Sequence, residues 1–85
     1  MKTKEVQVLR EQGMDAMSVA LCVQRASQFR ASVYLTDGSR RMNAKSLMGM
    51  MTLGVPQGEE VMVIADGMDE SQAISHINQY LSNES

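Results

Sequence analysis

The sequence is poor in several residue types, and each shortage excludes a class of protein. It contains one cysteine, Cys22, so no disulfide can form within the chain, and we expect a protein of the reducing cytoplasm. It has no basic run and a net charge of -2, which gives no electrostatic support for binding a nucleic-acid backbone. No apolar stretch is long enough to cross a membrane, and the residues after Met1 do not resemble a signal peptide.

The residues of a metal centre are also missing. There is one histidine, His76, and no cluster of acidic residues, so we expect no metal, no cofactor and no enzymatic activity. His76 stands between two apolar positions of an expected helix, which is more typical of a residue flanking the core than of a reactive one. Methionine is abundant instead, with nine among 85 residues, and its flexible side chain suits both irregular cores and adaptable binding surfaces.

The length and a hydrophobic content of 44% predict one domain, residues 1–85. Alternating polarity predicts strands at residues 5–8, Ser32–Thr36, residues 40–43 and Glu60–Asp66, with a hairpin turn at Asp37-Gly38. Helical periodicity predicts helices that begin at Asp15, Ser46 and Asp69, the last with a capping box completed by Gln72. The order β-α-β-β-α-β-α favours an α+β fold, a four-stranded, mostly antiparallel sheet with three helices on one face.

The most informative segment is Asn43-Ala44-Lys45-Ser46, which precedes a short, methionine-rich helix. Ser46 has the side chain of a helix N-cap, and the N-terminal end of a helix favours an added phosphate. The segment therefore has two interpretations: an ordinary N-cap over a buried turn, or a phosphorylation switch beside a binding surface.

The element order, the length and several segments together resemble the HPr family, the small phosphocarriers of the bacterial sugar phosphotransferase system. The matching segments are Asn43-Ala44-Lys45-Ser46-Leu47-Met48, Thr52-Leu53-Gly54, Gly58 and Asp66-Gly67-Met68-Asp69-Glu70. They cover essentially the whole chain. The resemblance implies an open-faced sandwich, in agreement with the periodicity.

The carrier site of the family is altered in this chain. In the family, a Gly-Leu-His-x-Arg-Pro-Ala-like motif opens the first helix, and its histidine carries the phosphate. Here Asp15 stands at the histidine position, Met17 at the arginine position and Ser18 at the proline position. The nitrogen nucleophile and the guanidinium that would hold a phosphate are both gone. Asp15 could be an aspartyl-phosphate site, but a helix N-cap is the simpler interpretation.

The regulatory part of the family pattern is retained. The resemblance implies that Ser46 is phosphorylated by an ATP-dependent HPr kinase/phosphorylase, after which the protein serves a LacI-type catabolite control regulator as corepressor. The Crh-type branch of the family lacks the active histidine and keeps this serine. Because Crh-type proteins keep the arginine that Met17 replaces, the partner here could also be another protein. The hypothesis is thus a regulatory protein in carbon catabolite regulation.

Two alternatives remain open at this point. The chain could be a phosphocarrier HPr of the phosphoenolpyruvate-dependent system, although Asp15 argues against that function. It could also be an HPr-like domain bound constitutively to a partner, with Ser46 serving only as a cap.

Mapping the sequence onto the family fold predicts an exposed apolar surface for partner binding. Asp15 and Ser46 stand at its edge, and its members are Met14, Met17, Leu47, Met48 and Met51. The alternative is that some of these methionines fill gaps in the core.

Overall fold

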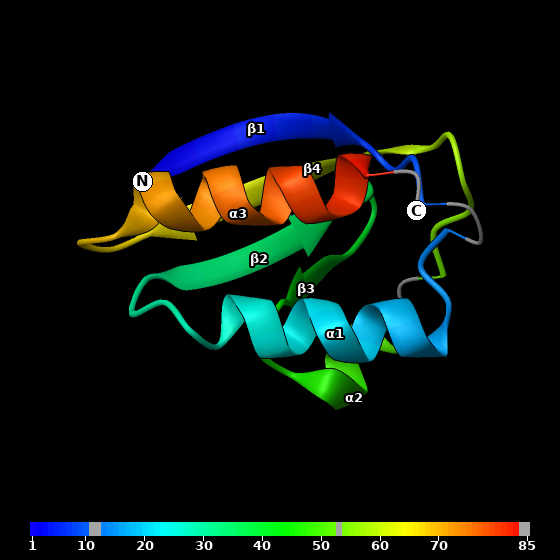
Figure 1. Ribbon diagram of the computed structural model, residues 1–85, viewed down its shortest axis with the longest axis horizontal. Helices are drawn as coiled ribbons and strands as arrows, with labels where there is room; N and C mark the ends of the chain where they lie inside the picture. Colours follow the sequence, from blue (N-terminus) through cyan, green and yellow to red (C-terminus); the bar gives the residue numbers. More distant parts are fainter. Residues whose placement is uncertain (11–12, 53, 84–85) are drawn as a thin grey trace.

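The computed structural model describes residues 1–10, 13–52 and 54–83, and its elements follow the predicted order (Figure 1). The strands are β1 (Lys2–Gln7), β2 (Ser32–Thr36), β3 (Arg41–Asn43) and β4 (Glu60–Asp66). The helices are α1 (Ala16–Ala26), α2 (Leu47–Met50) and α3 (Glu70–Ser82). In this part of the chain, no helix has the length and apolar character needed to cross a membrane.

The four strands form one antiparallel sheet in the order β1-β4-β2-β3. Strand β4 is central, pairing Val61 with Val6 of β1 and Val63 with Leu35 of β2. Its position explains the continuous apolar run of this strand, because β1 and β2 pair with its two edges. Val61 and Val63 are buried, and Met62 and Ile64 on the opposite face are half-buried. The hairpin from β2 to β3 turns at Asp37, whose carboxylate accepts hydrogen bonds from the backbone N–H groups of Ser39 and Arg40.

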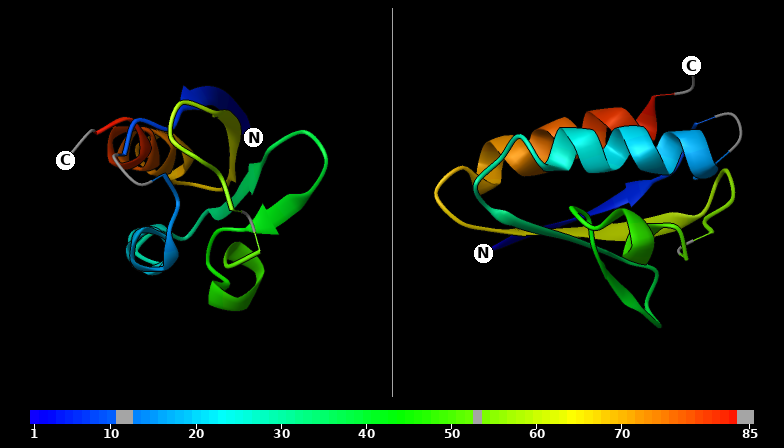
Figure 2. Two further views of the ribbon diagram at one scale, coloured as in Figure 1. Left: turned by 90° about the vertical axis from the view of Figure 1, so that its right-hand side faces the viewer. Right: turned by 90° about the horizontal axis from the view of Figure 1, so that it is seen from below.

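The helices lie on one side of the sheet, and the other side is open (Figure 2). Alternation along β2 assigns the two sides: Val33 and Leu35 are fully buried beneath the helices, whereas Tyr34 is half-buried on the open side. Helix α3 contributes the predicted apolar stripe, which consists of Ala73, Ile74, Ile77, Tyr80 and Leu81. The predicted fold class is therefore confirmed.

The start of α3 differs from the prediction of a capping box. The Asp69 side chain makes no capping hydrogen bond; its carboxylate accepts from the backbone N–H groups of Arg30 (2.9 Å) and Ala31 (2.8 Å). The capping-box prediction was wrong because the oxygens of Asp69 are used by the loop between α1 and β2, which is remote in sequence. Asp69 thus joins the end of α1 to the start of α3.

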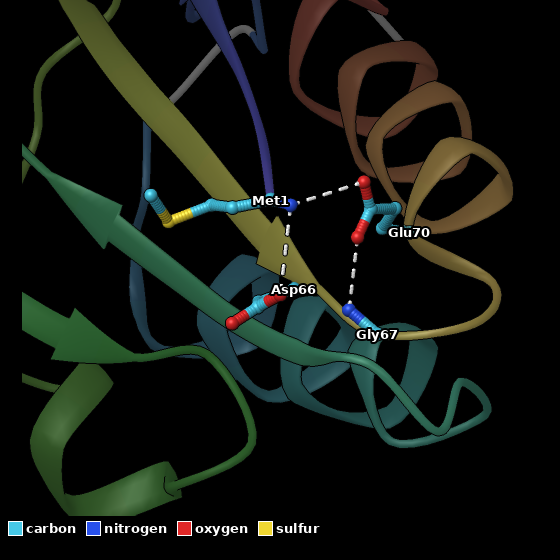
Figure 3. A network of polar contacts seen from close by, with 4 residues as sticks. All are labelled: Met1, Asp66, Gly67 and Glu70. Carbon is cyan, nitrogen blue, oxygen red and sulfur yellow. Dashed lines mark hydrogen bonds and ion pairs between the residues drawn. The ribbon is translucent and has the colours of Figure 1, made fainter.

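Glu70 holds the turn before α3 in place of the predicted box (Figure 3). Its carboxylate accepts a hydrogen bond from the backbone N–H of Gly67 at 3.0 Å. The amino group of Met1 lies 3.3 Å from Glu70 and 3.6 Å from Asp66. These contacts attach the start of β1 to the turn between β4 and α3.

The contact between Asp69 and the loop should make stability depend on pH. The two backbone N–H groups hold the pKa of Asp69 below its usual value. A carboxylate whose pKa is lowered by folding stabilises the protein above its unfolded pKa, and this contribution is lost as the pH falls through the folded pKa. We expect Asp69→Asn to reduce the urea midpoint at neutral pH, with the difference from the wild type disappearing in strong acid.

The matched control is Asp66→Asn, which removes the same charge from an exposed side chain that contacts the amino terminus of Met1 alone among the described residues. If Asp66→Asn lowered the urea midpoint at neutral pH as much as Asp69→Asn does, the proposed role of Asp69 in holding the loop would be contradicted.

Candidate functional site

Asp15 caps the first helix, as its position in the sequence predicts. Its carboxylate accepts a hydrogen bond from the backbone N–H of Ser18 at 2.8 Å, one of the free donors at the start of α1. This hydrogen bond is the main reason that the pKa of Asp15 lies below its usual value, and the Ser18 side chain and the charge of Arg10 lower it further. The carboxylate is therefore ionised and engaged in helix capping.

The segment before Asp15 is fixed by a close backbone approach. Gly13 has φ +65, and a Cβ atom added there would lie 2.5 Å from the carbonyl oxygen of Val55. The next residue, Met14, donates its backbone N–H to the same carbonyl at 2.8 Å. These contacts bind the start of α1 to the loop before β4.

The prediction that Met14 belongs to the exposed surface was wrong. Its side chain is 5% exposed and is part of the hydrophobic core together with Val55. The reason is local: the hydrogen bond to Val55 places Met14 at the loop, before the helix begins, where its side chain packs inward. Met17, one helical turn later, is 68% exposed.

A guanidinium group near Asp15 was missed by sequence reasoning. Arg10, from the segment after β1, donates from Nε to the hydroxyl of Ser18 at 3.3 Å and from Nη1 to the carbonyl of Tyr80 at 3.2 Å. No periodicity signals this contact, since Arg10 lies outside the regular elements and its partners come from two helices. Its Nε and Nη1 atoms are used by Ser18 and Tyr80, and its guanidinium lies against the Tyr80 ring in the groove between α1 and α3, so it does not take the place of an arginine at position 17.

Ser46 is the N-cap of α2 and is partly exposed. Its hydroxyl oxygen accepts a hydrogen bond from the backbone N–H of Gly49 at 3.3 Å. The preceding Asn43 turns the chain by accepting from the N–H of Lys45 at 2.9 Å. The Lys45 ammonium donates to the carbonyl of Phe29 at 2.6 Å, which joins α2 to the end of α1. The lysine is therefore held by α1 and has a structural partner of its own.

Three other members of the predicted surface are exposed on α2 or directly after it. The exposed fractions are 50% for Leu47, 85% for Met48 and 52% for Met51. Met50, by contrast, is fully buried and anchors the helix. Helix α2 packs against α1, which carries the exposed Met17. Four of the five predicted residues thus lie on the surface of two neighbouring helices.

The two remaining side chains with reactive groups, those of Cys22 and His76, are packed against other parts of the protein. Cys22 is fully buried, and burial raises the pKa of its thiol to about 12, which disfavours the reactive thiolate. His76 is half-buried on α3, and its Nε2 atom lies 3.3 Å from Nη1 of Arg25. Among the residues at 1–10, 13–52 and 54–83, no group of acidic, histidine and cysteine side chains could hold a metal ion.

Comparison with known proteins agrees with this fold. Residues 2–83 match the sequence model of a family described as the PTS HPr component phosphorylation site. The match covers nearly the whole chain, and the chain belongs to the HPr family. Members of this family are phosphocarrier and regulatory proteins rather than catalytic enzymes.

The similar proteins include both an HPr-like protein and phosphocarrier proteins. The HPr-like protein Crh of Bacillus subtilis (strain 168) is 39% identical over 84 residues, which is 99% of each chain. The crystal structure of phosphocarrier protein HPr from Bacillus anthracis superimposes with a TM-score of 0.90 at 32% identity, covering 94% of this chain and 95% of that one. A crystal structure of Crh itself, described as a swapped, intertwined dimer, gives a TM-score of 0.79 at 39% identity, with coverage of 100% and 98%.

Proposed function

We propose that this protein is a regulatory member of the HPr family that is phosphorylated on Ser46 by an HPr kinase/phosphorylase. The phosphorylated form acts by protein–protein contact in carbon catabolite regulation, with a LacI-type regulator as partner. The observation that carries the proposal is the contrast between two positions. Position 15, which holds the histidine in the family, carries a capping carboxylate and no nitrogen nucleophile, whereas position 46 keeps a half-buried serine at the start of α2 whose hydroxyl is the proposed phosphate acceptor.

The surroundings of Asp15 support the loss of carrier activity. A phosphoryl group on one carboxylate oxygen would leave the other to accept from Ser18, so the decisive feature is the lack of a suitably placed cation. Among the described residues no cation is placed to bind a phosphoryl group there, because Met17 is apolar and the hydrogen bonds of Arg10 to Ser18 and Tyr80 hold its guanidinium in the groove between α1 and α3. Enzymes that form aspartyl phosphates offset the added charge with such a cation.

The exposed side chains around α2 support action by contact. Leu47, Met48 and Met51 present apolar surface beside Ser46, and methionine adapts to partners of different shape. A phosphate on Ser46 adds a charge of about -1.5 to -2 at this surface. Phosphorylation should leave α2 folded, because the ester oxygen can still accept from Gly49. The modification therefore changes the charge of a surface that keeps its shape.

The phosphocarrier function is the alternative that the likeness to Bacillus anthracis HPr favours. It requires a phosphate acceptor at position 15, and the carboxylate there lacks the cation that acceptor would need. A constitutively bound HPr-like domain is a further possibility, in which the Ser46 hydroxyl acts as a cap alone.

Kinase treatment tests the proposed modification. We expect HPr kinase/phosphorylase with ATP to add the mass of one phosphoryl group to the wild type and to Ser75→Ala, a control at an exposed serine of α3. Ser46→Asn should remain unmodified. Asparagine keeps a capping oxygen, so this variant separates phosphorylation from helix stability, whereas Ser46→Ala would cost about 0.5–2 kcal/mol as well. An unmodified wild type, or full modification of Ser46→Asn, would overturn the proposal.

A further inference from the structure

A polar groove lies between α1 and α3, away from Ser46 and α2. These two helices run side by side in opposite directions on the sheet (Figures 1 and 2). The groove has a volume of about 310 Å³, and its polar lining includes Arg10, Arg25, His76, Gln79 and Tyr80. Small-molecule sites have volumes of roughly 300–1,000 Å³, so the groove suits a ligand of a few carbon atoms.

Two guanidinium groups lie against one aromatic ring in this groove. The central carbon of the Arg10 guanidinium lies 4.2 Å from the centre of the Tyr80 ring, and that of Arg25 lies 5.0 Å from it. The ring is itself fixed, because the Tyr80 hydroxyl donates to the carbonyl of Ser18 at 2.8 Å. Arg10 precedes α1 and Arg25 lies in the last turn of α1, and both contact the same ring on α3.

The positive charge in the groove has no ion-pair partner among the described residues. Within residues 1–10, 13–52 and 54–83, neither Arg10 nor Arg25 forms an ion pair. The acidic residue that responds to Arg10 is Asp15, whose pKa it lowers slightly, and that carboxylate is engaged as the cap of α1. Although the chain has a net charge of -2, these two cations of the groove therefore have no ion pair within the described ranges.

The hydrogen bonding of Arg25 is incomplete. Its Nη1 lies 3.3 Å from Nε2 of His76. The Nε atom of Arg25 is buried and has no hydrogen-bond partner. Buried donors are nearly always satisfied, and an unsatisfied one in a charged group is costly, so an acceptor is missing here.

We propose that this groove binds a small phosphomonoester, with its phosphate held by Arg10 and Arg25. The planar fork of a guanidinium matches the oxygens of a phosphate, and two such groups match its double negative charge. A phosphate oxygen bound at Nη2 of Arg25 would also supply an acceptor for the buried Nε after a small rotation of the side chain. Gln79 offers hydrogen bonds to the ester portion of the ligand. The proposal is independent of Ser46 and of any partner protein.

The test is a titration of the isotope-labelled full chain by nuclear magnetic resonance. Glycerol 2-phosphate is the probe, acetate is the comparison anion, and sodium chloride keeps the ionic strength constant. We expect saturable shifts confined to the facing sides of α1 and α3, including the Nε–H signal of Arg25. The phosphomonoester should bind at least about tenfold more tightly than acetate, as expected for added charge-assisted hydrogen bonds.

Two arginine variants with the same change of charge decide where the anion binds. Arg25→Gln should weaken binding by at least about tenfold, whereas Arg30→Gln, at an exposed residue outside the groove, should change it by less than about twofold. Arg25→Lys keeps the charge without the fork and should also weaken binding. The spectra themselves report whether each variant is folded, and Arg10→Gln provides a second variant of the site. Equal binding of acetate and phosphomonoester, or equal losses for Arg25→Gln and Arg30→Gln, would overturn the proposal.

Discussion

Incubation with phosphoenolpyruvate and the general phosphotransferase enzyme is expected to leave this protein without a phosphoryl group. The histidine position holds Asp15, whose carboxylate caps α1 through the N–H of Ser18 at 2.8 Å. The arginine position holds Met17, which is 68% exposed and cannot bind a phosphate. Intact-mass measurement after the reaction gives a direct answer. An added phosphoryl group on the wild type, absent from Asp15→Asn, would contradict this expectation and identify an aspartyl phosphate.

Restoring the phosphocarrier activity should require substitutions at both position 15 and position 17. Asp15→His supplies a nitrogen nucleophile, but the guanidinium that binds the phosphate is still missing. Arg10 cannot substitute for it, because its hydrogen bonds to Ser18 and Tyr80 hold its guanidinium in the groove between α1 and α3. We expect Asp15→His combined with Met17→Arg to accept phosphate at least about tenfold faster than Asp15→His alone, as for the loss of one charged hydrogen-bonding group. Equal rates for the two variants would show that the account of Met17 is wrong.

A second large effect is expected from Met50→Ala. Met50 is fully buried beneath α2, so truncation leaves a cavity and should reduce the free energy of unfolding by about 2–5 kcal/mol. In a domain of this size, each kcal/mol corresponds to roughly 4–8 °C in melting temperature. Urea unfolding and calorimetry measure the two quantities independently.

The same substitution at Met48 is the matched control. Met48 lies on the same helix and is 85% exposed, so Met48→Ala should change the free energy of unfolding by less than about 0.5 kcal/mol. If the exposed surface binds a partner, Met48→Ala should nevertheless weaken that binding. A stability loss at Met48 as large as that at Met50 would place its side chain in the core and remove it from the proposed surface.

The features that were predicted correctly depend on residues that are close together in the sequence. The alternation of Val33, Tyr34 and Leu35 gave the two sides of the sheet, because side chains along a strand point to opposite faces in turn. Asp15 and Ser46 were predicted as caps because an N-cap binds an N–H group three residues later.

The features that were missed depend on contacts between remote segments. Asp69 carries the local pattern of a capping box, yet its oxygens bind the loop at Arg30 and Ala31, which the pattern cannot indicate. Met14 and Met17 both follow Gly13 closely, and the backbone contact with Val55 decides that one is buried and the other exposed. The groove at Arg10 and Arg25 likewise exists because α1 packs on α3.

The central claim is that phosphorylation of Ser46 controls contact with a partner protein, and calorimetric titration of a LacI-type catabolite control regulator tests it most directly. Three samples are compared: the wild type before kinase treatment, the wild type after it, and Ser46→Asn after it. The phosphorylated wild type is predicted to bind at least about tenfold more tightly than the other two, which should be indistinguishable. Equal affinity of the phosphorylated and unphosphorylated wild type would contradict the account.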